Sequence, residues 1–401
     1  MFRGLTIAVL SVIALLPFAD LSYACHQESF VKERCARVAV APDTSKIYIV
    51  YTDTLNQVVF KRSTDLGTTW SLPVILSQGL DNHRSSMTID DAGGIYVAWL
   101  EKTLLKVYWT YSLDYGETWA EQAPVTTSEE VAFSTEIAVY RNGTGDITVK
   151  VASIFKGSIR PKTLRFRWTT DLGKTWSKVT TIDRVGIGRH SIVTDPLQGN
   201  ANLAYLSAPG SNVFYTRETE IRGEFRDRVN VSQTSPGSRA QMVSLAIPGE
   251  GTRYMVWSEK FRVGDLRLRI SYSRDFGETW VPAYDVRNDG GASKFPRLVA
   301  RPYDRENDRL YVVYTSSPGH RVGFMRSLDS GLTWDEPVDL CPVVSPMCVR
   351  PDIAIGPSSM LVVTMAASSP GDRDKTHVYF TKSIDDGLSW SVPIQVSREG
   401  E

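Results

Sequence analysis

Four arginines occupy one place in the sequence, three residues before an apolar residue at the start of a short β-rich run. They are Arg84 (RSSMTI), Arg189 (RHSIVT), Arg239 (RAQMVS) and Arg350 (RPDIAI), and Lys294 (KFPRLVA) lies one residue off this register. Guanidinium groups donate paired hydrogen bonds to carboxylate, sulfate or phosphate groups, so converging arginines would bind an anionic sugar. In the other interpretation, the arginines pair with acids of neighbouring units and stabilise the fold.

Two carboxylates are the candidates for acid–base chemistry. Glu259 (VWSEK) and Glu101 (AWLEK) each follow a tryptophan by two residues, at the end of another β-rich run. Glycoside hydrolysis commonly uses a pair of carboxylates, so these two are predicted as catalytic residues. A tyrosine nucleophile activated by a glutamate is a second route, with Tyr205 or Tyr314. The alternative for each carboxylate is an ordinary solvated loop residue.

Related positions in other runs carry different residues. Arg34 and Arg37 precede the first run, Glu136 (FSTEIAV) interrupts the arginine pattern, and His83 and His190 flank two of the arginines. The expectation is a ring of guanidinium groups with a few carboxylates among them, provided that the fold brings the starts of these runs together.

A repeated octapeptide shows how the fold does so. Its pattern is Ser or Thr, any residue, Asp, any, Gly, any, Ser or Thr, Trp. The copies are Ser63–Trp70, Ser112–Trp119, Thr169–Trp176, Ser273–Trp280, Ser327–Trp334 and Ser383–Trp390. Asp accepts hydrogen bonds from nearby backbone N–H groups and Gly adopts positive φ, so the pattern predicts a tight turn with a buried Trp. Its Asp is therefore a structural residue.

The spacing of the copies predicts the architecture. Intervals are near 50 residues, except one of 104 that is about twice as long, where a copy has decayed within Arg217–Arg226. Each unit contains three short β-rich runs, the octapeptide and a fourth run, between about Arg37 and Ser397. We predict an all-β fold, a seven-bladed β-propeller of four-stranded antiparallel blades. The starts of the innermost strands then share one face, and the octapeptides lie on the opposite face.

Composition sets further limits. The 401 residues include 45 basic and 45 acidic side chains, so the overall charge does not suggest a nucleic-acid-binding protein. No metal site and no cofactor are predicted, because no clustered ligands occur. Residues 25–401 are expected to form a single domain.

The N-terminus has the features of an export signal. Met1–Ala24 contains Arg3, an apolar stretch too short to span a membrane comfortably, and small residues before the expected cleavage point. We therefore expect an exported protein that is periplasmic, cell-surface or extracellular, with no membrane span. The alternative is that Cys25, which would become the N-terminal residue after cleavage, is lipidated.

Four cysteines are present, and an even number in an exported chain suggests disulfides. The simplest pairing joins near neighbours, Cys25 with Cys35 and Cys341 with Cys348. A cross pairing such as Cys35 with Cys348 would instead link the two ends of the repeat array.

The octapeptide resembles the Asp-box, or bacterial neuraminidase repeat, of the sialidase superfamily, and the resemblance covers nearly the whole mature chain. It implies Asp-box turns in a sialidase-like propeller. Sialidases have six blades, three arginines that grip the sialic acid carboxylate, a Tyr–Glu nucleophile pair, an Asp acid/base and an Arg-Ile-Pro motif. This chain has seven units and no Arg-Ile-Pro; Arg37-Val38-Ala39 is the nearest counterpart.

Two functions follow from these observations. The first is a sialidase-like propeller that binds an anionic or decorated glycan and, if it is an enzyme, hydrolyses it as an exo-sialidase-like glycoside hydrolase. The second is a non-catalytic propeller that serves as a platform for a protein partner or for envelope assembly. A deep axial site with an arginine cluster favours the first, and a flat or plugged face favours the second.

Overall fold

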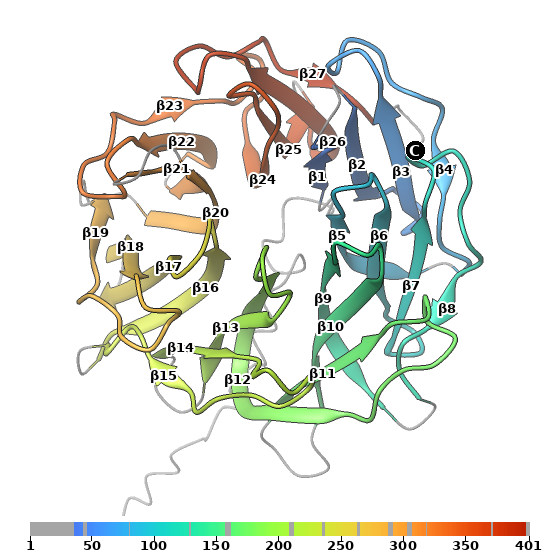
Figure 1. Ribbon diagram of the computed structural model, residues 1–401. Helices are drawn as coiled ribbons and strands as arrows, with labels where there is room; N and C mark the ends of the chain where they lie inside the picture. Colours follow the sequence, from blue (N-terminus) through green and yellow to red (C-terminus); the bar gives the residue numbers. More distant parts are fainter. Residues whose placement is uncertain are drawn as a thin grey trace, which may run out of the picture.

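The computed structural model is a ring of seven antiparallel β-blades around a central axis (Figure 1). It describes residues 36–42, 46–79, 81–127, 130–156, 162–207, 212–234, 237–262, 265–287, 292–302, 307–317, 319–369 and 372–397. The seven-bladed, four-stranded architecture predicted from the repeat is confirmed. Met1–Ala24, Cys25 and Cys35, on which the export signal, the lipidation site and two disulfide alternatives depend, lie outside the described residues.

The first three blades follow one another along the chain. Blade 1 contains β1 (Arg37–Val40), β2 (Ile47–Thr52), β3 (Val58–Ser63) and β4 (Val74–Ile75). Blade 2 contains β5 (Asn82–Ile89), β6 (Ile95–Glu101), β7 (Lys106–Ser112) and β8 (Ala123–Pro124). Blade 3 contains β9 (Ala132–Arg141), β10 (Ile147–Phe155), β11 (Lys162–Thr169) and the first part of β12 (Thr180–Thr194).

The remaining blades repeat this order. Blade 4 contains the second part of β12, β13 (Ala201–Ser207), β14 (Asn212–Arg217) and β15 (Val229–Asn230). Blade 5 contains β16 (Arg239–Ala246), β17 (Arg253–Arg262), β18 (Asp265–Ser273) and β19 (Tyr284–Arg287). Blade 6 contains β20 (Ala292–Pro302), β21 (Asp308–Ser317), β22 (Arg321–Ser327) and β23 (Val338–Asp339). Blade 7 contains β24 (Cys348–Ile355), β25 (Leu361–Ser369), β26 (Asp372–Ser383) and β27 (Ile394–Gln395).

Strand β12 joins two blades. Its first part pairs with β11 and its second part with β13, so blades 3 and 4 share one seven-stranded sheet. The outermost strand of one blade thus runs directly into the innermost strand of the next.

The ring closes by packing between complete blades. Strands β1–β4 form the first sheet and β24–β27 the last, so neither end completes the other's sheet. One core cluster contains Ile49 and Tyr51 of blade 1 together with Val362 and Phe380 of blade 7. The Val38 amide also donates to Asp352 of blade 7 at 3.0 Å. Burial of apolar side chains at this junction is the main stabilising contribution.

The octapeptides form tight turns, as their sequence predicts. In the first copy the Asp65 carboxylate accepts from the amide and hydroxyl of Thr69, at 2.8 and 2.7 Å, and from the Ser63 hydroxyl at 2.7 Å. These bonds, led by the Thr69 amide, lower the pKa of Asp65 to about 2. Gly67 has φ of +83°, and a Cβ there would collide with the ring of Phe380.

Each octapeptide also fastens its blade to the preceding one. Trp119 packs edge-on against Phe60 at 4.8 Å, and Trp390 against Phe324 at 4.8 Å. Blade 4, where the octapeptide has decayed, keeps this contact with a different ring, since Phe225 lies 5.0 Å from Phe166. The interblade contact is therefore retained where the turn chemistry has been lost.

The register places the octapeptides far from the strand starts. Val40 at the end of β1 pairs with Ile47, which pairs with Ser63 at the start of the first octapeptide. The beginnings of the innermost strands consequently lie at the opposite end of each sheet. Within the described part of the chain, no helix is long and apolar enough to cross a membrane.

Candidate functional site

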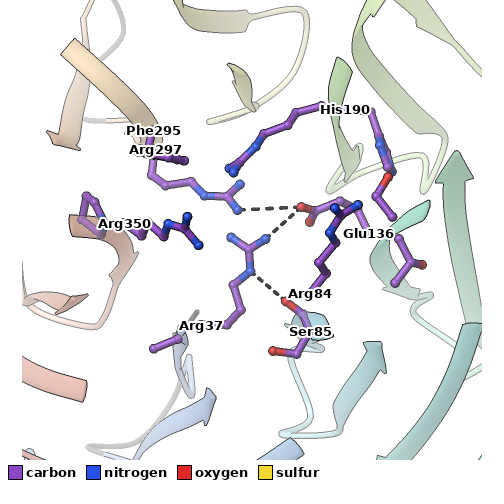
Figure 2. Close-up of a pocket in the computed structure, with 13 residues that line it drawn as sticks. Arg37, Arg84, Ser85, Glu136, His190, Phe295, Arg297 and Arg350 are labelled. Carbon is purple, nitrogen blue, oxygen red and sulfur yellow. Dashed lines mark hydrogen bonds and ion pairs between the residues drawn. The ribbon is translucent and has the colours of Figure 1, made fainter. Parts of the chain in front are cut away.

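The seven innermost strands surround the axis, each contacting the next, and one pocket opens where they begin (Figures 1 and 2). Five arginines line it, one from each of blades 1, 2, 4, 6 and 7: Arg37, Arg84, Arg189, Arg297 and Arg350. Its other lining residues include Ser85, Ser134, Glu136, His190 and Phe295. The pocket has a volume of about 70 Å³, the room of a few water molecules.

Two of the arginines are tied to carboxylates across the axis. Arg37 contacts Glu136 at 2.9 Å and Asp352 at 3.5 Å, and Arg297 contacts the same two carboxylates at 3.7 and 3.4 Å. Burial opposes the charge of Arg37, but both carboxylates outweigh it and raise the pKa of its guanidinium. This network connects blades 1, 3, 6 and 7, so the structural interpretation of the arginines holds for these two.

The other three arginines bring excess positive charge to the pocket. Burial, followed by the like charges of Arg350, Arg37 and Arg84, lowers the pKa of Arg189 to about 9. The Arg189 guanidinium is still protonated at neutral pH, but it is held there at an electrostatic cost. Among the described residues, the carboxylates of Glu136 and Asp352 contact the pocket arginines, and five guanidinium groups line the pocket.

A repeated bulge aims several of these side chains at the axis. The innermost strands of blades 2, 5, 6 and 7 each show a register shift near their start. The shift contains one non-glycine residue with positive φ in every case: Arg84 (54°), Met242 (49°), Phe295 (54°) or Arg350 (56°). Such a residue costs about 1–2 kcal/mol, and a bulge re-aims its side chain. Arg84, Phe295 and Arg350 line the pocket.

Phe295 is the aromatic side chain among the lining residues. The guanidinium of Arg189 lies over its ring, 4.8 Å from the centroid, and that of Arg350 lies over it at 5.1 Å. The ring itself is only 7% exposed. Two cations from blades 4 and 7 therefore share one aromatic ring from blade 6.

Uncharged polar groups complete the pocket wall. Nε2 of His190 donates to the carbonyl of Ala152 at 2.9 Å, and burial lowers the pKa of this histidine, so it is neutral. Within the described residues, Nδ1 of His190 and the hydroxyls of Ser85 and Ser134 have no hydrogen-bond partner. The wall thus retains unused hydrogen-bonding capacity.

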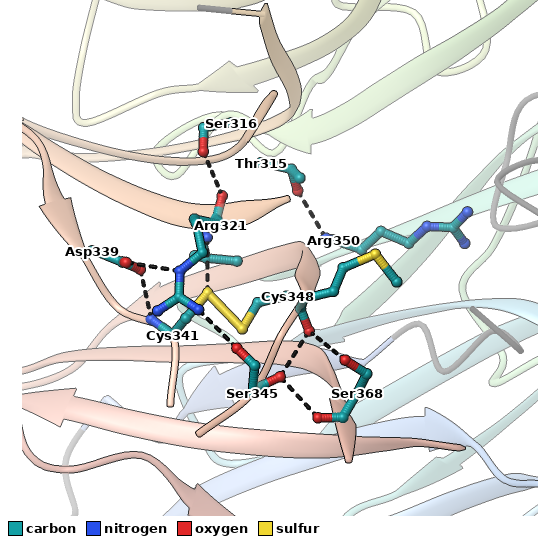
Figure 3. The surroundings of a disulfide bond; sticks show 11 residues. Thr315, Ser316, Arg321, Asp339, Cys341, Ser345, Cys348, Arg350 and Ser368 are labelled. Carbon is teal, nitrogen blue, oxygen red and sulfur yellow. Dashed lines mark hydrogen bonds and ion pairs between the residues drawn. A yellow bond between two sulfur atoms is a disulfide. The ribbon is translucent and has the colours of Figure 1, made fainter. Parts of the chain in front are cut away.

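A disulfide lies just before one of the pocket arginines (Figure 3). Cys341 pairs with Cys348, the local pairing expected for these two residues. Cys348 is fully buried at the start of β24, two residues before Arg350. The Arg350 amide donates to the Thr315 hydroxyl at 3.0 Å. The disulfide therefore holds the backbone that leads into the Arg350 bulge.

The structure brings together three of the five predicted binding residues, Arg84, Arg189 and Arg350. Arg239 and Lys294 are not among the lining residues, which corrects their predicted placement. Arg239 is the exposed first residue of β16, three residues before the bulge at Met242. In blade 6 the bulge residue is Phe295, the neighbour of Lys294.

Neither predicted catalytic carboxylate lines the pocket. Glu259 is 2% exposed and accepts from the Ser238 hydroxyl at 2.8 Å and the Trp257 indole at 3.1 Å. Glu101 is 7% exposed and accepts from the amide of Leu104 in the turn that follows it. The alternative interpretation of both as solvated loop carboxylates is wrong, since both are buried and hydrogen-bonded next to their own strands.

Two contributors were missed in the sequence. Arg297 and Phe295 lie in the segment KFPRLVA, where Lys294 was predicted as the binding residue in their place. The segment did contain a signal, since Phe295 and Pro296 separate Lys294 and Arg297. Two residues between these cations fit a β-bulge, and the bulge brings both Phe295 and Arg297 to the wall of the pocket.

Comparisons with known proteins support the architecture. No family model and no curated protein matches the sequence. Among solved structures, a polysaccharide lyase of family PL25, an ulvan lyase bound to -[GlcA(1-4)Rha3S]-, is 12% identical with a TM-score of 0.54, covering 86% of this chain and 94% of that one. The GH93 α-L-arabinofuranosidase of Fusarium graminearum is 14% identical with a TM-score of 0.53, covering 75% and 92%.

Sialidases are also found among the similar structures. The NanB sialidase of Streptococcus pneumoniae is 10% identical with a TM-score of 0.48, and the alignment covers 94% of this chain and 70% of that one. At such identities the likeness to the lyase and the arabinofuranosidase shows the propeller fold alone. The function must therefore be argued from the pocket.

Proposed function

We propose that this chain is an exported β-propeller that binds the anionic group of a glycan in the axial pocket. The observation that carries the proposal is the charge of the described lining, where five guanidinium groups converge with the carboxylate of Glu136 and that of Asp352 contacts two of them. The like charges of Arg350, Arg37 and Arg84 disfavour the charged form of Arg189, so an anion in the pocket would relieve the repulsion among these arginines.

The size and lining of the pocket agree with this proposal. A volume of about 70 Å³ accommodates a carboxylate or sulfate group, whereas the rest of a sugar would extend toward the open end. The unused acceptor of His190 and the hydroxyls of Ser85 and Ser134 suit a polar ligand or its water. The similar lyase and arabinofuranosidase, named for activities on glycans, are consistent with a carbohydrate ligand.

The geometry supports binding better than hydrolysis. Among the described residues, the carboxylates that contact the pocket arginines, Glu136 and Asp352, are each held by both Arg37 and Arg297. The residues that line the described pocket include no tyrosine, so no Tyr–Glu pair is formed there. Glu259 and Glu101 are occupied within their blades.

The test is a glycan-binding screen with matched variants. Wild-type protein should bind glycans that carry carboxylate or sulfate groups and should not bind neutral glycans of the same length. The triple variant Arg84→Met, Arg189→Met, Arg350→Met should lose this binding, because it removes three cations from the pocket. Arg239→Met is the control, since it removes an exposed arginine outside the pocket.

Three outcomes would contradict the proposal: binding of neutral glycans alone, equal binding by the triple variant, or binding of a protein partner without any glycan. Turnover is measured in the same samples. If turnover occurs, Glu101→Gln and Glu259→Gln decide whether these residues carry it, because retained turnover in both variants excludes them.

A further inference from the structure

We infer that Phe295 is a positioning residue, which acts through Arg189 and Arg350 by holding both guanidinium groups at the axial pocket. This inference rests on the proposed function for its binding test, but it also has a test that needs no ligand. Its basis is the pair of contacts at 4.8 and 5.1 Å between one ring and two guanidinium groups.

The electrostatics explain why a ring is needed there. Arg350 is the nearby charge that most disfavours the protonated form of Arg189. An aromatic face is negative, so it attracts a cation without neutralising it as a carboxylate would. Phe295 can therefore keep two mutually repelling arginines close together without neutralising their charge.

The bulge has the same backbone conformation in four blades, so blade 6 differs from the others in the side chain at this position. Met242 and Phe295 occupy the same positive-φ bulge in neighbouring blades, with φ of 49° and 54°. The strained conformation is thus a property of this strand position, shared with Arg84 and Arg350. What distinguishes blade 6 is an aromatic ring at the bulge, where blades 2 and 7 place arginine and blade 5 methionine.

The side chain is also well placed to act as a fixed support. Phe295 is buried, and its backbone N–H donates to the sulfur of Met242 at 3.2 Å. Arg297, two residues later, is held separately by Glu136 and Asp352. A change in the Phe295 ring should therefore affect Arg189 and Arg350 and leave Arg297 in place.

The binding test uses inorganic sulfate as the probe and isothermal titration calorimetry as the measurement. Phe295→Leu keeps apolar volume but removes the ring, so the dissociation constant should rise by roughly five- to thirtyfold for two lost cation–π contacts. Phe295→Tyr keeps the ring and should restore wild-type affinity. In the Arg189→Met, Arg350→Met background, Phe295→Leu should have no further effect, because its action passes through those arginines.

Phe261 provides a matched control. Arg267 and Arg269 lie over its ring at 4.4 and 5.5 Å, in the same kind of arrangement but outside the pocket. Phe261→Leu should leave sulfate affinity within twofold of wild type. Unchanged affinity in Phe295→Leu, or an equal loss in Phe261→Leu, would overturn the inference.

The second measurement is the rate at which phenylglyoxal modifies each arginine, followed by peptide mass spectrometry without any anion. Phe295→Leu should speed modification of Arg189 and Arg350 but not of Arg297, and Phe295→Tyr should not. If wild type binds no sulfate while these rates still change, the proposed function fails and the positioning role stands. Unchanged rates at Arg189 and Arg350 would overturn the positioning role whether or not sulfate binds. Should Phe295→Leu not fold, Phe295→Met, which copies blade 5, takes its place in both measurements.

Discussion

Replacing Arg189 by methionine should stabilise the protein while it weakens anion binding. Arg189 is half-buried beside like charges, and desolvation followed by these charges lowers its pKa from the ordinary arginine value to about 9. A site built only for stability would not keep such a residue. The substitution therefore separates a binding site from a structural ion-pair network.

The size of the effect follows from that pKa. The fall from the ordinary arginine pKa to about 9 corresponds to roughly 5 kcal/mol of unfavourable free energy for the charged form, at about 1.4 kcal/mol for each tenfold change. Water in the open pocket screens part of this cost. Methionine also loses the contact with the Phe295 ring, worth about 0.5–1 kcal/mol. We expect a net gain of about 1–3 kcal/mol in the free energy of unfolding.

The assay is urea denaturation at pH 7 in a low-salt buffer without sulfate or phosphate. Adding sulfate should then stabilise wild type, because a ligand of the folded state raises its unfolding free energy, and should stabilise Arg189→Met much less. Arg239→Met is the control, and its stability should stay within about 0.5 kcal/mol of wild type.

The pH dependence has a definite sign. The folded pKa of Arg189 lies below its unfolded value, so the unfolded chain binds more protons from about pH 9 up to the ordinary arginine pKa. Over that range the stability of the wild type therefore rises with pH. The advantage of Arg189→Met should be full below pH 9 and shrink above it. A loss of more than about 1 kcal/mol in Arg189→Met without anion, against a silent control, would refute the reasoning and make Arg189 a structural residue.

Three further predictions concern the network, the turns and the disulfide. Glu136→Gln should lower the free energy of unfolding by about 2–4 kcal/mol and tighten sulfate binding, both checked by denaturation and calorimetry; unchanged stability would contradict the cross-axis network. Asp65→Asn should destabilise the protein at pH 7, and its difference from wild type should disappear as pH falls from 3.8 through about 2, because the depressed pKa of Asp65 contributes stability only while the carboxylate is charged. Replacing Cys341 and Cys348 by serine should cost about 2 kcal/mol and weaken sulfate binding in wild type but not in an Arg350→Met background; equal weakening in both would show that the disulfide does not act through Arg350.

Much of the fold could be predicted from the chain because its information is local. Hydrogen bonds of the Ser63 and Asp65 kind join residues two to four positions apart, so the octapeptide specifies its own turn. The spacing of the copies then fixed the blade count, including blade 4, where Phe225 replaces the tryptophan contact. Repeat period and turn chemistry suffice for architecture because each blade uses the same short-range rules.

The pocket was predictable only in part because it depends on bulges. Counting residues from an apolar anchor located Arg84 and Arg350, which occupy the bulge itself. The same count failed for Arg239, because a shift of position along a strand changes where a side chain points. The count also missed Phe295. The spacing in its own segment indicates a bulge, but the two guanidinium groups over its ring come from other blades and cannot be inferred from that segment.

The chain's own residues thus specify seven blades, their turns and an arginine-rich set of strand starts, since all of these follow from contacts within about ten residues or from a repeated spacing. Closing the ring decides which arginines meet and which of them are held by Glu136 and Asp352. It also decides that Glu101 and Glu259 do not line the pocket. Ring closure brings together Arg37 and Asp352, which are 315 positions apart in the sequence. The electrostatics of the site therefore depend on contacts between residues that are distant in the chain.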